Sequence, residues 1–115
     1  MKNLILIFSL IFTSSFIPAQ RVDVWKTITI PPGESLFIHE VKAPVTLELK
    51  NLSDKEINLS SKLTMPRSIA AASGFTYRLP KKASLSIENR NTDAVSLYLH
   101  YTSSKSILIN NKEVR

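Results

Sequence analysis

The chain has 115 residues, no cysteine and a formal net charge of +6 at pH 7. This length supports one hydrophobic core, and the missing cysteine excludes disulfide bonds, thiol catalysis and lipidation at a cysteine. Residues 63–115 carry most of the charge, because basic residues there outnumber Glu88, Asp93 and Glu113. A net charge of this size is also ordinary for a soluble small domain.

The first predicted element is a secretory signal peptide over residues 1–19. Lys2 supplies the positive start, Leu4–Phe12 forms a mainly apolar run, and Ala19 provides the small residue before the cut. The run is shorter than the roughly 18 apolar residues of a membrane span, which disfavours the alternative of an uncleaved anchor. We expect cleavage after Ala19, export to the periplasm or the extracellular space, and one domain over residues 20–115.

The rest of the chain is dominated by the alternation of apolar and polar residues that is typical of half-buried strands. It predicts an all-β fold, a single antiparallel β-sandwich of about seven to eight strands, immunoglobulin-like or cupredoxin-like. A polar tail follows the last strand. The strands are expected over residues 22–30, 36–41, 45–50, 57–63, 75–79, 85–87, 95–101 and 107–109.

Two of these strand pairs are joined by similar turns, and both predict antiparallel hairpins. Residues 51–55 (NLSDK) connect the first pair, and residues 89–93 (NRNTD) connect the second. When the two segments are overlaid, Asn51 matches Asn89. A duplicated half-sandwich is one interpretation. Convergence is favoured, because Asn and Asp are preferred at turns for local hydrogen-bonding reasons.

One segment departs from the alternation and predicts a short helix between the two sheets. Residues 66–74 begin with Pro66, contain an alanine run and end at Gly74. Proline near the start and glycine after the end is the asymmetry of a helix. The alternative is a loop of small residues.

Candidate catalytic groups are few. Only His39 and His100 could act as bases near neutral pH, and no serine lies in a G-x-S-x-G turn. A metal site from two histidines would lack the thiolate of a blue-copper centre. We therefore expect no enzyme activity, no metal and no cofactor, and export disfavours a nucleic-acid partner.

Two groups of side chains are candidates for binding. Trp25 and Tyr98 form a candidate stacking platform for a sugar ring or a partner side chain. Burial of Trp25 in the core is the competing interpretation, and the usual environment of tryptophan favours it. A candidate anion-binding patch, for which a solvated surface is the favoured alternative, consists of Arg67, Arg78, Lys81, Lys82 and Arg90.

These features together predict an exported, non-catalytic binding module of the periplasm or the cell surface. Its partner would be another exported protein or a surface glycan or lipid, bound by strand addition at a sheet edge or by a loop patch. One alternative is a structural subunit or small inhibitor that pairs with one protein partner through its edge strands. A second alternative is the binding of an anionic glycan or lipid through the basic patch.

Overall fold

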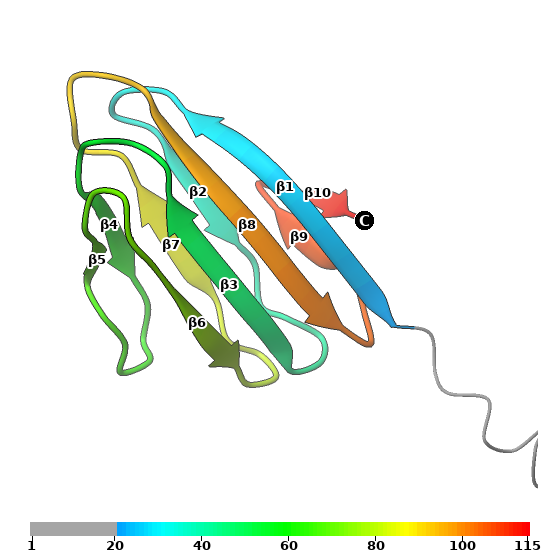
Figure 1. Cartoon of the computed structure of the whole chain (residues 1–115). Coiled ribbons are helices and arrows are strands. Elements are labelled where there is room, and N and C mark those ends of the chain that lie inside the picture. Colours follow the sequence, from blue (N-terminus) through cyan, green and yellow to red (C-terminus); the bar gives the residue numbers. More distant parts are fainter. Residues whose placement is uncertain (1–20) are drawn as a thin grey trace, which may run out of the picture.

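Two antiparallel sheets face each other in the computed structural model, which describes residues 21–115 (Figure 1). The expected signal peptide and its cut lie outside these residues. Sheet A contains, in spatial order, β1 (Val22–Ile30), β8 (Val95–Ser103), β3 (Val45–Asn51) and β6 (Gly74–Leu79). Sheet B contains β10 (Lys112–Val114), β9 (Ile107–Ile109), β2 (Ser35–Ile38), β7 (Leu85–Glu88), β4 (Ile57–Ser60) and β5 (Ser68–Ile69). This arrangement confirms an all-β fold with two antiparallel sheets, consistent with a β-sandwich.

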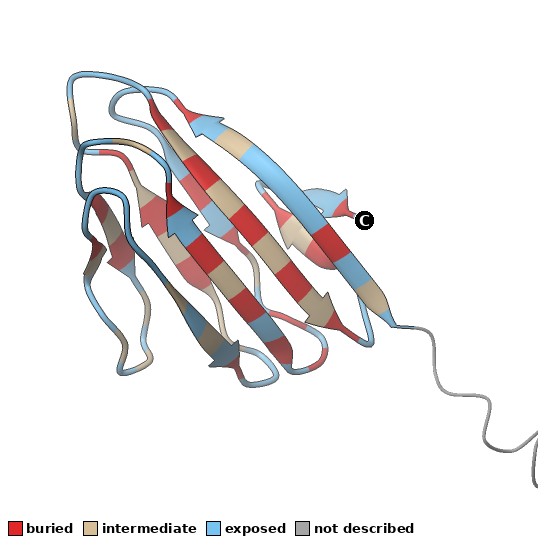
Figure 2. Ribbon diagram, viewed as in Figure 1, coloured by how far each residue is buried: buried red, intermediate tan, exposed pale blue. Residues whose placement is uncertain are grey.

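The core lies between the sheets and is made by alternate residues of each strand. Figure 2 shows the alternation along β8, where Leu97, Leu99 and Tyr101 are fully buried and the residues between them are half-buried. β1 follows the same period, with Val24 and Ile30 buried. Because successive side chains of a strand point to opposite faces, the odd-numbered residues of β1 and the even-numbered residues of β8 form the outer face of sheet A.

Both predicted hairpins are wrong. β3 lies in sheet A and β4 in sheet B, while β7 lies in sheet B and β8 in sheet A. The chain therefore crosses between the sheets at each of the two turns, and β3 pairs with β6 and β8 instead of β4. The alternation predicts which face of a strand is buried, but it does not identify the strand's neighbour.

The helix predicted over residues 66–74 is also wrong, because the described residues contain no helix. The segment contains β5, a turn and the start of β6 at Gly74, and it does pass from sheet B to sheet A. Ile69 is buried and pairs with Ile57. One buried apolar residue gives a short helix too little packing to form, and a strand pairing satisfies the backbone instead. No helix in the described part of the chain is long and apolar enough to cross a membrane.

The predicted polar tail is instead a strand. Asn110 and Asn111 have φ angles of 51° and 68°, and they turn β9 back into β10. Two successive residues with positive φ are the requirement of a tight hairpin turn, which asparagine tolerates better than most residues. The strand count of residues 21–115 is therefore ten rather than seven or eight. Val114 of β10 is buried, and its carbonyl accepts a hydrogen bond from the Tyr101 hydroxyl.

Candidate binding face

Trp25 lies on the outer face of sheet A and is 58% exposed. The competing interpretation, in which Trp25 is buried in the core, is therefore wrong. The core side of β1 is taken by Val24 and Ile30, whose side chains point to the opposite face. A large aromatic ring left in solvent loses the free energy of burial that most tryptophans gain, so its position on a strand invites a functional explanation.

The Trp25 ring stacks on His100 of the neighbouring strand. The ring centroids are 4.8 Å apart and the planes differ by 9°. Two carboxylates hold the imidazole in place: Asp23 Oδ1 lies 2.6 Å from Nε2, and Glu48 Oε1 lies 3.4 Å from Nδ1. The hydrogen bond from His100, with a smaller contribution from the Thr102 hydroxyl, holds the pKa of Asp23 below its ordinary value. The indole therefore rests on a ring whose orientation is fixed from both sides.

Tyr98 shares this outer face but is not the stacking partner of Trp25. It lies opposite Thr27 on β1 and opposite Lys50 on β3, and the Lys50 Nζ atom is 5.6 Å from the tyrosine ring centroid. We call the surface formed by Asp23, Trp25, Glu48, Lys50, Tyr98 and His100 the Trp25 face. Its middle is aromatic and its border carries charges of both signs.

The part of this face that the sequence missed is His100. Both histidines were considered as bases, whereas the register of β1 with β8 places His100 directly beside Trp25. His39 lies on the outer face of the other sheet. Its ring centroid is 4.7 Å from that of Phe37, and its Nε2 atom accepts a hydrogen bond from the Asn111 amide. The two histidines are therefore on opposite sides of the sandwich. No group of three or more potential metal ligands occurs within residues 21–115.

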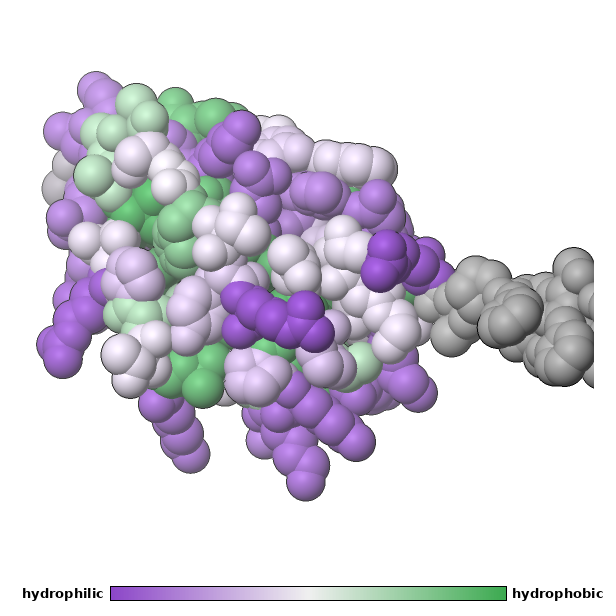
Figure 3. Space-filling model, turned by 60° about the horizontal axis from the view of Figure 1, so that its bottom comes forward, coloured by the Kyte–Doolittle hydropathy of each residue, from purple (hydrophilic) through white to green (hydrophobic). Residues whose placement is uncertain are grey.

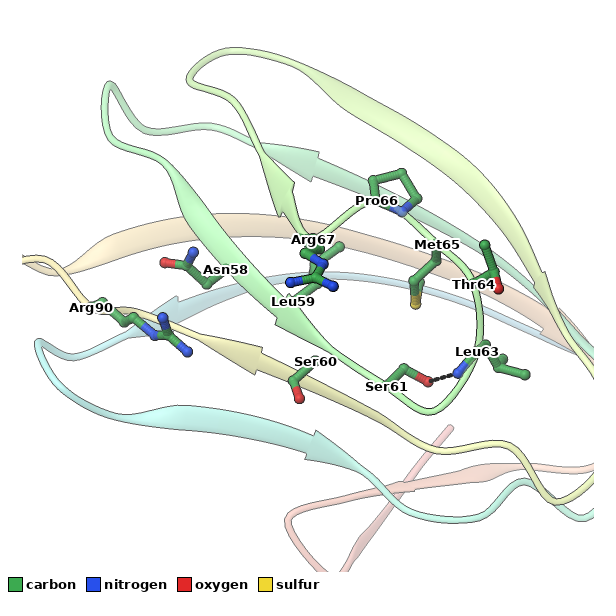
Figure 4. A pocket seen from close by; sticks show the side chains of 10 residues that line it. All are labelled: Asn58, Leu59, Ser60, Ser61, Leu63, Thr64, Met65, Pro66, Arg67 and Arg90. Carbon is green, nitrogen blue, oxygen red and sulfur yellow. Dashed lines mark hydrogen bonds between the residues drawn. The ribbon is translucent and has the colours of Figure 1, made fainter.

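The five residues of the candidate anion-binding patch are divided into two groups. Arg67 and Arg90 line one hollow of about 510 Å³ beside β4 (Figure 4). They come from segments on either side of that strand, because β4 lies between β5 and β7 in sheet B. Arg90 is engaged already, because its Nη2 atom is 2.7 Å from Glu88 Oε1.

The second group lies around the turn between β6 and β7. Arg78 is on the outer face of sheet A, opposite Thr46, and Lys81 and Lys82 follow in the turn. Lys82 has a φ of 74°, a conformation that favours glycine or asparagine. This turn precedes β7, whereas Arg90 follows it. In the view of Figure 3, hydrophilic side chains project separately from the surface, with apolar areas between them.

Comparison with known proteins gives the fold only. No family model matches the chain, and no curated protein matches it. Among solved structures, it is similar to the crystal structure of TT1209 from Thermus thermophilus, with a TM-score of 0.55 and 14% sequence identity over 76% of each chain. A likeness at this level of identity supports the β-sandwich architecture, which occurs with many unrelated functions.

Proposed function

We propose that the chain is an exported, non-catalytic binding module, and that it binds another exported protein through the Trp25 face. The observation that carries the proposal is the exposed Trp25 ring, held on an imidazole that is itself fixed by two carboxylates. Preorganised aromatic side chains surrounded by polar groups are typical anchors of protein interfaces, because burying them costs little side-chain entropy.

Phe37 provides a matched control for Trp25. It is also an exposed aromatic residue of a strand, 39% exposed, and it also contacts a histidine, but it lies on the outer face of sheet B. A non-specific effect of removing a surface aromatic ring would be the same at both positions. A binding face on sheet A would be sensitive only to the change at Trp25.

The experiment is affinity capture from the exported fraction of the source organism with three immobilised proteins. These are the wild type, Trp25→Ala and Phe37→Ala, each checked for folding by circular dichroism. We expect the wild type and Phe37→Ala to retain the same protein and Trp25→Ala to lose it. Equal retention by all three proteins would contradict the proposal. Intact-mass analysis of the exported chain tests the expected cut after Ala19 in the same preparation.

The alternative of anionic glycan or lipid binding would rest on fewer residues than the five of the candidate patch. Lys81 and Lys82 adjoin Arg78, whereas Arg67 and Arg90 belong to the separate hollow beside β4. If the alternative holds, Lys81→Glu/Lys82→Glu should weaken retention on an anionic glycan matrix, most strongly at low salt. The immunoglobulin-like or cupredoxin-like topology stays a prediction.

A further inference from the structure

The open edge of β1 presents the backbone groups of the same residues that form the Trp25 face. The Leu52 amide donates to the Ser96 carbonyl at 2.9 Å, one pair beyond the end of the β3–β8 register. Because hydrogen-bonded pairs alternate along an antiparallel ladder, the even-numbered residues of β8 bond to β3 and the odd-numbered residues bond to β1.

The register of β1 with β8 then fixes the direction of every backbone group in β1. Odd-numbered residues of β8 lie opposite even-numbered residues of β1, as Leu99 lies opposite Lys26. The odd-numbered residues of β1, Trp25 among them, therefore direct their amide and carbonyl groups away from β8. Within residues 21–115, no strand pairs with that side of β1.

The free face of the Trp25 ring points over the same edge. His100 covers one face of the indole from the β8 side, in a nearly parallel stack. Trp25 and His100 form a pair without mutual hydrogen bonds, the arrangement in which cross-strand side chains approach most closely. The other face of the indole therefore points away from β8, toward the position that a side chain of an added strand would occupy.

Lys26 supplies the second recognition element. It lies opposite Leu99 on the core-facing side of β1, yet it is exposed, and none of the ion pairs among the described residues includes it. An inward-facing charge on an edge strand opposes indiscriminate strand pairing. An acidic side chain opposite Lys26 would satisfy that charge, so the same residue would select one kind of partner strand.

We infer that the β1 edge accepts one antiparallel strand from another exported protein, and that this strand carries an acidic, an aromatic and an aliphatic residue in that order. They would lie opposite Lys26, Trp25 and Val24, and the aromatic ring would extend the stack of Trp25 on His100. The antiparallel direction follows the rest of sheet A, in which all three pairings are antiparallel. The inference rests on the proposed function and names its partner.

The probe is a blocked synthetic peptide with a central Glu-Tyr-Val in threonine-rich flanks and no tryptophan. The chain contains a single tryptophan, Trp25, so its fluorescence reports binding at this edge directly. In the proposed pairing, the amide of the peptide tyrosine points toward β1, whereas the amide of the peptide glutamate points away. N-methylation of each amide in turn gives a test and its matched control.

We expect N-methylation at the tyrosine to weaken binding about tenfold or more, and N-methylation at the glutamate to change it less than about threefold. Lys26→Glu should weaken binding of the Glu-Tyr-Val peptide by about tenfold. A Lys-Tyr-Val peptide should recover that binding in the same variant.

Three results would overturn the inference: no binding of the peptide to the wild type, equal effects of the two N-methyl groups, or no effect of Lys26→Glu. Sedimentation of the wild type without peptide tests one more occupant of the β1 edge. A dimer that forms in the wild type but not in Trp25→Ala would show that a second copy of the chain pairs with this edge, and the inference of another exported protein would be overturned. The proposed function fails separately. It falls if Trp25→Ala captures the natural partner as well as the wild type does, whatever the peptide does.

Discussion

Asn51 and Asn89 occupy equivalent places at the two crossings between the sheets. Each is 1% exposed, and each donates from its Nδ2 atom to the carbonyl four residues later, that of Lys55 or Asp93. Each also accepts a hydrogen bond at Oδ1 from the amide two residues later. Asparagine can do both because its amide group carries a donor and an acceptor.

The two asparagines also tie their turns to distant segments. Asn51 donates to the Ile69 and Ala70 carbonyls beside β5, and Asn89 donates to the Ile30 carbonyl at the end of β1. The NLSDK and NRNTD segments are thus similar because their asparagines make the same set of hydrogen bonds. Each asparagine replaces with its side chain the backbone pairing that a crossing turn cannot provide.

We predict that Asn51→Ala and Asn89→Ala each lower the free energy of unfolding by about 3 kcal/mol, because each leaves buried carbonyl and amide groups without partners. Urea denaturation followed by circular dichroism measures the change. Asn58→Ala, on the half-buried outer side of β4, is the control and should cost less than about 0.5 kcal/mol. A loss at Asn89 no larger than the loss at Asn58 would contradict this role.

The strands could be predicted from the sequence, whereas their pairing could not. Alternation identifies buried faces such as that of Leu97 and Leu99, since it records local periodicity. The turns at Asn51 and Asn89 have the composition of hairpin turns. Whether such a turn joins neighbours or crosses between sheets depends on distant partners such as Ile30 and Ile69, which local sequence does not contain.

Only part of the candidate binding face could be predicted, because the rest depends on how the strands pair. Trp25 and Tyr98 stood out as aromatic residues on polar strand faces, and both lie on the outer face of sheet A. The stack on His100 and the bonds to Asp23 and Glu48 depend on the order β1–β8–β3. That order brings together three strands widely separated along the chain.

Gly74 has no room for a side chain where β6 begins beside β3. A Cβ atom at this position would lie 2.4 Å from the Leu49 carbonyl oxygen, which is a backbone atom of the adjacent strand. We predict that Gly74→Ala costs about 1–3 kcal/mol of stability, because the two strands must separate. Hydrogen exchange should show faster opening of the β6 amides.

Gly33 is the control for this substitution. It has a φ of +74° in the turn after β1, but a Cβ atom there would meet nothing within 4 Å. Gly33→Ala should cost about 1 kcal/mol through backbone strain alone. Exchange in β6 should stay at the wild-type rate in this variant, and acceleration there would argue against a local effect at Gly74.

Tyr101 connects the core of sheet A to the last strand. Its side chain is fully buried, and its hydroxyl donates to the Val114 carbonyl. Tyr101→Phe should cost about 1–2 kcal/mol, since the buried carbonyl then lacks this donor. Amide exchange in β10 should accelerate more than exchange in β3, and uniform acceleration would contradict a local attachment.

The same residue predicts a loss of stability at alkaline pH. Burial raises the pKa of Tyr101 above its ordinary value of 10.0. The unfolded chain therefore releases the phenolic proton first, and the folded state loses stability as the pH rises above that value. The Tm measured from about pH 9 to about pH 11 should fall more steeply with pH for the wild type than for Tyr101→Phe.

Asp23 predicts the opposite dependence at acidic pH. The hydrogen bond from His100 holds its pKa in the folded state below the ordinary value of 3.8. A lowered pKa stabilises the fold at pH values above the ordinary pKa, and this contribution disappears as the pH falls through the lowered one. The difference in Tm between the wild type and Asp23→Asn should therefore shrink from about pH 5 to about pH 2.

Asp54→Asn, which removes an exposed carboxylate from the turn after β3, is the matched control. A difference at Asp23 that stays constant with pH would mean that the carboxylate does not act through its charge, and the fixed orientation of the imidazole beside Trp25 would then need another explanation.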